Sequence, residues 1–394
     1  MSASITVKPG ILAWARETLG LSQKEVIEKA KIDRPTLQAW ENGEAPISLA
    51  NLKYLANLYK RPLGVFFLPA VPNIEAFPPD FRTLDSTKTE NLSPQVRLMV
   101  RRAQRNREIY KEILELLEES WKDDLGSVST TKDPEKAAQF FREKFEISLE
   151  TQFSWADKAA ALKQWINILE GKNVLVAQGT MPIKELRAFC LRGSGLPPAI
   201  VLNTKDDEKG RIFSLWHEFG HLLVPHTEIQ KLIAEAGDNG AHKLVEKFAN
   251  HFAGAFLVPR ESLLNDPQLK KYLEEKNDYI LSRIAGRYRV SSEVILRRLV
   301  ILGLVEDAFY GQKKAEFDAN FQKRQEEDEK EDEKSGFQTP SSKAFQSLGV
   351  ALTGRLFEAQ GKGKVSASDI ATYFEVKTKH FGKIKELLDK RTGT

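Results

Sequence analysis

Apolar side chains recur at helical spacing through most of this chain, and strand-like runs are few. One long amphipathic pattern covers residues 93–120 and another covers 278–305. Only two short runs, 173–177 and 199–203, have the branched, continuous apolar composition of buried strands. We find no internal repeat. The pattern predicts a mostly α protein with a small β-sheet (α+β).

Changes in composition divide the chain into five parts. Prolines at 69, 72, 78 and 79 prevent regular helix after the first part and suit an extended connector. The run QEEDEKEDEK at 325–334 is typical of a solvated linker. We therefore expect an all-α domain over 1–70, a proline-rich connector and long helix over 71–132, a larger helical domain over 133–310, a charged linker over 311–340 and a short helical element over 341–394.

Residues 19–43 have the pattern of two short helices joined by a tight turn. Ser22 with Glu25 forms a capping box at the first helix, and Asp33 is a good N-cap for the second. Gly43 suits the stop of the second helix. Two helices joined by about three residues have the geometry that sets a recognition helix into a DNA major groove.

The predicted second helix leaves Arg34, Thr36 and Gln38 facing outward, and Gln23 begins the first helix. Arg and Gln side chains read guanine and adenine edges, and Gln23 is placed to reach a phosphate or a base edge. The spacing alone is equally compatible with a plain helical hairpin that has a solvated polar face.

The segment closely resembles the Cro/repressor-type (XRE) helix-turn-helix family over about residues 9–66, through LSQKEV, TLQAWENG and LANLYKRPLGVFF. The resemblance implies binding to operator sites in duplex DNA. The positive charge of the segment is modest, so a homodimer is one way of reaching useful affinity. A row of arginines on the long helix is either a set of phosphate contacts or, more often in such helices, a solvated face. The row consists of Arg97, Arg101, Arg102, Arg105 and Arg107.

The stretch FSLWHEFGHLLVP, residues 213–225, places ionisable side chains inside an apolar helix. His217 and His221 are four residues apart and share one helical face, while Glu218 lies about 100° away around the helix. This is the H-E-x-x-H arrangement, which supplies two zinc ligands and a general base. Gly220 is a poor helix former, and its presence predicts a second element packed closely beside the site. A pair of hydrogen-bonded core histidines is the alternative.

A catalytic zinc site needs a third protein ligand and an open fourth position. The buried helical pattern over 241–259 offers Glu246, with Asn250 one turn later on the same face. We expect Glu246 to be the ligand and Asn250 to hold a ligand imidazole by a hydrogen bond. The alternatives for the third ligand are His226, His242 and His251.

The motifs RIFSLWHEFGHLLV and EKFANHFAGAFLVPRE together resemble the ImmA/IrrE family of metallopeptidases over about residues 170–262. The resemblance implies a mostly helical, zincin-like domain that holds Zn²⁺ through His217, His221 and Glu246, with Glu218 as catalytic acid/base. Family members cut or inactivate helix-turn-helix repressors, and some are fused to a repressor-like domain. The C-terminal tail resembles a helical element of longer members.

Two functions follow from these patterns. The first is a DNA-binding transcriptional regulator with a zinc metalloendopeptidase domain that cleaves a helix-turn-helix repressor or a toxin/antitoxin-type partner. Its substrate would be an extended segment added to the small sheet. The second is a non-proteolytic DNA-binding repressor or antitoxin that uses the metallopeptidase fold for binding or sensing. No residue stands out as the oxyanion stabiliser, although Arg211, His242 and several tyrosines are candidates.

Composition indicates the cellular compartment in which the protein acts. The formal charge is +4, with 59 basic and 55 acidic residues, which does not by itself imply nucleic acid. The single cysteine excludes an internal disulfide and fits a reducing compartment. The chain has no apolar run of membrane-spanning length and no signal-peptide pattern at its start. We therefore expect a cytoplasmic protein without a membrane segment.

Overall fold

The computed structural model describes residues 4–72, 81–82, 92–332 and 338–393. Most of these residues are helical and the strands are few, which confirms the predicted mostly α fold with a small sheet. The chain divides into two compact units, 1–81 with 85–105 and 82–84 with 106–394. The division falls inside helix α5 (Pro94–Leu116), so the first unit is longer than the predicted domain over 1–70. Much of the predicted proline-rich connector lies outside the described residues.

The first unit is a small helical domain with its own apolar core. Leu12, Val26 and Leu37 are fully buried in that core. The predicted caps are present, because Ser22 and Glu25 form a capping box and Asp33 Oδ1 accepts a hydrogen bond from Thr36 N at 2.8 Å. Its elements are β1 (Ser4–Ile5), α1 (Ile11–Glu17), α2 (Gln23–Ala30), α3 (Arg34–Glu41), β2 (Ile47–Ser48), α4 (Leu49–Leu58) and the 3-10 helix η1 (Leu63–Phe67), with β1 antiparallel to β2.

The second unit contains a four-stranded sheet in the order β3-β5-β6-β4. Its strands are β3 (Phe81–Arg82), β4 (Leu175–Gly179), β5 (Ala188–Gly193) and β6 (Leu196–Asn203). Strand β4 runs parallel to β6, and β5 runs antiparallel to it. The sequence pattern predicted β4 and β6 but missed β5. Ser194 and Gly195 both have positive φ, 56° and 64°, and they form the two-residue loop of a β5–β6 hairpin.

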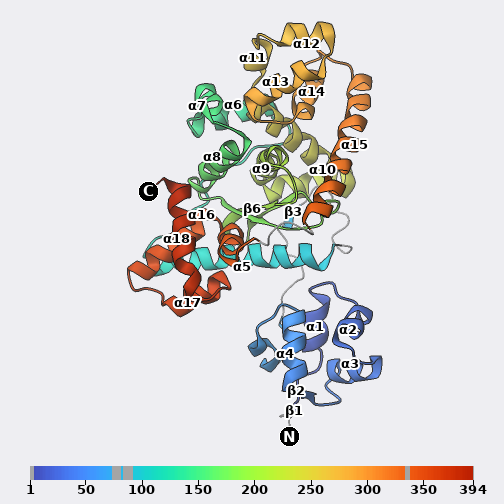
Figure 1. The fold of residues 1–394 in the computed structure, drawn as a ribbon, viewed down its shortest axis with the longest axis vertical. Helices are drawn as coiled ribbons and strands as arrows, with labels where there is room; N and C mark the ends of the chain where they lie inside the picture. The colour runs from blue at the N-terminus through green and yellow to red at the C-terminus, as the bar shows by residue number, and fades with distance from the viewer. Residues whose placement is uncertain (1–3, 73–80, 83–91, 333–337, 394) are drawn as a thin grey trace. The chain divides into compact units, whose positions relative to one another are not determined.

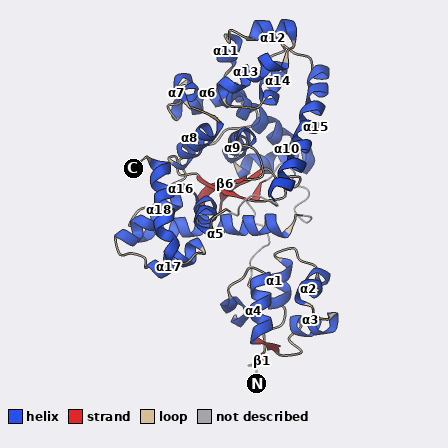
Figure 2. Ribbon diagram, in the orientation of Figure 1, coloured by secondary structure: helices blue, strands red, loops and turns tan. Residues whose placement is uncertain are grey.

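Helices cover both faces of this sheet (Figures 1 and 2). On one face, Val176 and Ile200 join the large apolar core that includes α8 and α9; on the other, Leu175 and Ala199 pack with α16 and the second half of α5. The helices of this unit are α6 (Pro134–Lys144), α7 (Leu149–Ser154), α8 (Lys158–Glu170), α9 (Glu208–Leu223), α10 (His226–Leu257), α11 (Arg260–Leu264), α12 (Leu269–Glu275), α13 (Asp278–Tyr288), α14 (Ser292–Ile301), α15 (Asp307–Asp332), α16 (Pro340–Gly361), α17 (Ala367–Phe374), the 3-10 helix η3 (Thr378–His380) and α18 (Phe381–Thr392).

Two sequence-based expectations need correction here. The segment over 311–340, expected to be a linker, is helical as far as Asp332, because α15 continues through most of the acidic and basic run. The arginine row of α5 is neither one solvated face nor one set of phosphate contacts, because some of its members bind carbonyl oxygens within the protein. Arg107 is fully buried, and its guanidinium donates to the carbonyl oxygens of Pro197 and Gly193 at 2.6 and 2.8 Å. Arg101 donates instead to the carbonyl of Lys60 at 2.8 Å.

The C-terminal helices belong to the same compact unit as the sheet and are not a separate element. Helix α16 is kinked at Gly349, which has φ +79°. The amides of Val350 and Ala351, which begin its second half, donate to the carboxylate of Glu170 at 3.2 and 3.1 Å. A buried carboxylate at the end of α8 thus caps the half-helix that packs against β4.

Replacing Gly349 by alanine is expected to destabilise the second unit. A Cβ atom there would lie 2.5 Å from Val176 O and 2.6 Å from Glu170 Oε1, and the positive φ is itself strained for an L-residue. We expect Gly349→Ala to lower the free energy of unfolding by about 1–3 kcal/mol, measured by urea denaturation. Gly354→Ala in the same helix is the control, since a Cβ there would contact nothing within 4 Å. Similar losses for both variants would contradict this account of the kink.

Candidate functional site

Helix α9 carries the H-E-x-x-H motif into the core of the second unit. Asp207 caps the helix by accepting a hydrogen bond from Gly210 N at 2.7 Å. The last two turns are surrounded by other elements, so that His217 is 2% exposed, Glu218 0% and His221 3%. Burying three ionisable side chains in this way is unfavourable unless partners compensate for the lost hydration.

Helix α10 supplies the partner, because it crosses α9 at very short range. A Cβ on Gly220 would lie 3.0 Å from Ala249 Cα and 3.3 Å from Ala249 Cβ. The expected close packing at Gly220 is therefore confirmed. The crossing brings Glu246, which lies one turn before Ala249, to the face of α9 that bears both histidines.

The three side chains form a compact triangle of ligand atoms. His217 Nε2 and His221 Nε2 are 3.0 Å apart. Glu246 Oε1 lies 2.9 Å from His221 Nε2, and Glu246 Oε2 lies 3.5 Å from His217 Nε2. Two ligands that are each about 2.0–2.1 Å from a tetrahedral zinc ion lie about 3.3 Å from one another. The triangle therefore has the dimensions of three positions of a tetrahedral metal site.

The electrostatics of the triangle also suit a metal. Burial, followed by the nearby His221, lowers the pKa of His217 to about 3, although the Glu246 carboxylate acts in the opposite direction. The His217 imidazole is thus neutral at pH 7, which is the form that binds metals. Burial raises the pKa of Glu246, while His217 and His242 lower it.

The alternative third ligands lie in other places. His226 is exposed at the start of α10. His251 Nε2 lies 2.8 Å from Glu135 Oε1, so it pairs with α6. His242 Nε2 is 3.9 Å from Glu246 Oε1 and borders the triangle without joining it. Among the described residues, only His217, His221 and Glu246 gather as a possible metal-binding group.

Two further residues from the sequence analysis have defined partners. The side chain of Asn250 is exposed, and its Nδ2 donates to the backbone carbonyl of Glu246 at 2.9 Å. Its role in orienting a ligand imidazole stays a prediction. Arg211 donates from Nη1 to Gln178 Oε1 on β4 at 2.8 Å and lies 3.4 Å from Glu208. These partners direct Arg211 toward β4, whereas His242 borders the triangle.

A partly buried ion-pair cluster near the site was missed by the sequence analysis. Arg298 and His251 both bind the carboxylate of Glu135, at 2.6 and 2.8 Å. Burial alone would raise the pKa of Glu135, but these hydrogen bonds outweigh it and lower the pKa to about 2. The three residues are distant in sequence and share no local motif, so no spacing rule indicates the cluster. It ties α10 to α6 and α14 one turn beyond Glu246.

In the first unit, the predicted DNA-reading residues of α3 lie on its accessible side. Arg34 and Gln38 are exposed, and Thr36 is half-buried. Gln23 differs from them, because its Nε2 donates to Glu41 Oε2 at 2.9 Å. Glu41 is itself buried and paired with Arg16, whose Nε lies 2.6 Å from Glu41 Oε1. One N–H of the Gln23 amide is therefore engaged within the domain, and the other N–H and the amide oxygen are left for a ligand.

Comparisons with known families agree with both halves of this description. Residues 172–300 match the peptidase family M78, described as the IrrE N-terminal-like domain, and residues 12–66 match the family described as Helix-turn-helix. A search of curated proteins found no match to the chain. The chain joins an XRE-type helix-turn-helix segment to an IrrE/ImmA-like domain of a metallopeptidase family. Within the described residues, no helix has the length and apolar character needed to cross a membrane.

The metal-binding group makes a direct prediction. Purified protein is expected to carry about one zinc or similar divalent ion per chain, and His217→Ala is expected to remove most of it, because two remaining ligands hold zinc poorly. Elemental analysis measures both. His226→Ala, an exposed histidine on the same helix as Glu246, is the matched control and should retain the metal. Metal retained in His217→Ala would overturn the assignment.

The exposed face of α3 leads to a prediction about DNA binding. Arg34→Ala is expected to weaken binding to an operator by about 1–3 kcal/mol and to weaken binding to random duplex DNA much less, because base contacts carry the specificity. Binding to the protein's own promoter at several salt concentrations measures both. Equal weakening on the two DNAs would make Arg34 a phosphate contact.

Proposed function

We propose that this protein is a transcriptional regulator that binds duplex DNA and uses a zinc metalloendopeptidase domain to cleave a helix-turn-helix repressor or a toxin/antitoxin-type partner. Cleavage would relieve repression of phage, mobile-element or stress genes. The observation that carries the proposal is the triangle of His217, His221 and Glu246 with Glu218 buried on the same helix. The proposal places the protein in the cytoplasm.

The triangle is the ligand set in this proposal. His217 and His221 present imidazole nitrogens, and Glu246 adds a carboxylate oxygen whose negative charge favours a divalent cation. A zinc ion bound there supplies a Lewis acid that polarises the scissile carbonyl and activates a water molecule.

Glu218 is the acid/base of the proposed reaction. Its side chain leaves α9 about 100° from that of His217, so it lies beside the ligand triangle and is not part of it. The Glu218 carboxylate takes a proton from the attacking water and gives it to the nitrogen of the leaving amine. His242, at the border of the triangle, is proposed to donate to the developing negative charge on the carbonyl oxygen.

The route of the substrate is restricted on one side of the sheet. Val176 lies on β4, which is an edge strand, but Val176 O is closely approached by Gly349 of α16, and its amide hydrogen bonds to Glu170. An extended substrate therefore cannot add to β4 at Val176 while α16 stays in place. A substrate that binds by strand addition would pair with another part of the sheet.

Glu218→Gln is the test that separates proteolysis from binding. Gln has nearly the size of Glu but cannot accept the proton, so we expect cleavage to fall by about 10²–10⁴-fold while zinc content and DNA binding are retained. The measurement is cleavage of helix-turn-helix repressors encoded beside this protein, together with release of a reporter gene in cells.

His221→Ala is the comparison variant, because it should lose metal as well as cleavage. Reporter release that survives in Glu218→Gln would defeat the protease proposal. The non-proteolytic regulator would then be the remaining function for the same residues.

A further inference from the structure

A cavity of about 310 Å³ lies in the second unit between α8, β4, α16 and α18. None of the residues of the metal-binding triangle lines it. Three cationic side chains do, namely Lys163, Lys390 and Arg391, and no acidic side chain is among the lining residues. A concave surface that carries one sign of charge concentrates ligands of the opposite sign.

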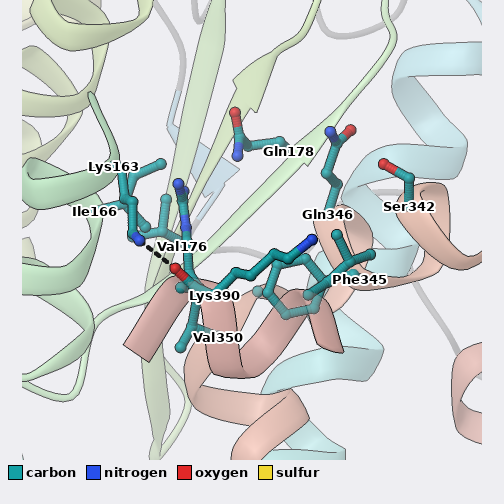
Figure 3. Close-up of a pocket in the computed structure, with 12 residues that line it drawn as sticks. Lys163, Ile166, Val176, Gln178, Ser342, Phe345, Gln346, Val350 and Lys390 are labelled. Atoms are coloured by element: carbon teal, nitrogen blue, oxygen red, sulfur yellow. Dashed lines mark hydrogen bonds between the residues drawn. The ribbon is translucent and has the colours of Figure 1, made fainter. Parts of the chain in front are cut away.

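The remaining walls combine an apolar surface with a few amides. Ile166, Phe345 and Leu387 supply apolar surface, while Gln178 and Gln346 supply amide groups. In Figure 3 the side chain of Lys390 extends across the cavity toward Gln346 and past Phe345. Pockets for small organic molecules commonly have this composition, mostly apolar with a few polar groups that fix orientation.

The cationic side chains are only partly compensated by the protein. The Nε atom of Arg391 is buried and has no hydrogen-bond partner among the described residues. Arg211 is close enough to lower the pKa of Arg391 further, after the larger effect of burial. The carboxylate that opposes them is Glu170, and its oxygens already accept the amides of Val350 and Ala351. Burial also raises the pKa of Glu170 to about 7, so its negative charge is only partial at neutral pH.

We propose that this cavity binds a small organic anion. A carboxylate or phosphate group lies against Lys163, Lys390 and Arg391, and an apolar or aromatic group lies against Phe345 and Leu387. The planar guanidinium of Arg391 suits the two oxygens of such an anion, and the lysines supply further charge. The cavity volume is near the lower end of the range for ligand pockets, which suits a molecule of the size of an aromatic carboxylate or a nucleoside monophosphate.

The cavity also has a direct connection to the metal-bearing helix. Gln178 lines the cavity and accepts a hydrogen bond from Arg211, which stands in the first turns of α9. A ligand that binds Gln178 therefore competes with, or reinforces, a contact of the helix that carries His217 and His221. Binding itself requires neither metal nor proteolysis, so it stands independently of the proposed function.

Isothermal titration calorimetry on the full chain as purified tests the proposal. AMP and indole-3-acetate are the anionic probes, and adenosine and indole are their neutral counterparts. We expect at least one anion to bind with a Kd below about 1 mM, and its neutral counterpart to bind at least about tenfold more weakly. The anion that binds distinguishes the phosphate from the carboxylate.

Lys390→Met removes one cationic group from the cavity and is expected to weaken binding about tenfold or more. Lys383→Met is the matched control, since Lys383 is on the same helix, is exposed and does not line the cavity. The proposal is overturned if neither anion binds, if the neutral counterparts bind equally well, or if Lys390→Met and Lys383→Met have the same effect.

Discussion

The close crossing of α9 and α10 is the contact on which the metal-binding group depends. Gly220 has no Cβ, and this allows Ala249 to approach the backbone of α9 more closely than any larger residue would allow. Glu246 then lies within 3.5 Å of both histidines. An alanine at position 220 would favour the helix locally, but it would push α10 outward and widen the triangle. Gly220 therefore allows the close packing of α9 against α10, although it lowers the helix propensity of α9 itself.

Buried polar side chains hold α10 in this position along its C-terminal half. The Glu135 carboxylate binds His251 and Arg298, and Arg298 also donates to the carbonyl of Val258 at 3.0 Å. Gln152 donates to the carbonyls of Leu257, the last residue of α10, and of Tyr288 in α13. Each of these groups would be costly to bury alone. Together they tie the C-terminal half of α10 to its neighbours.

The C-terminal helices cover part of the sheet in the second unit. They cover Val176 at the edge of β4, and with α8 they enclose the cationic cavity. The sheet is thus contacted on one face by α9 and on the other by α16, with Arg211 and Gln178 joining α9 to the cavity wall. This arrangement makes the sheet the element through which a bound anion and the metal site are connected.

Local rules of helix geometry were enough to predict the shared face of His217 and His221 and the caps at Ser22 and Asp33, because each depends on residues within one or two turns. The position of Glu246 beside the two histidines depends instead on the crossing of α9 and α10. Hydropathy was also enough for the overall fold class. The sequence did not reveal that Arg107 is a buried support of the β5–β6 hairpin, that Gln23 binds Glu41, or that Glu135 pairs with Arg298. Those outcomes depend on partners 18 to 163 positions away. Only the tertiary structure decides these roles. A polar side chain at the surface can bind a ligand, whereas the same side chain in the core serves as a structural hydrogen-bond donor or acceptor.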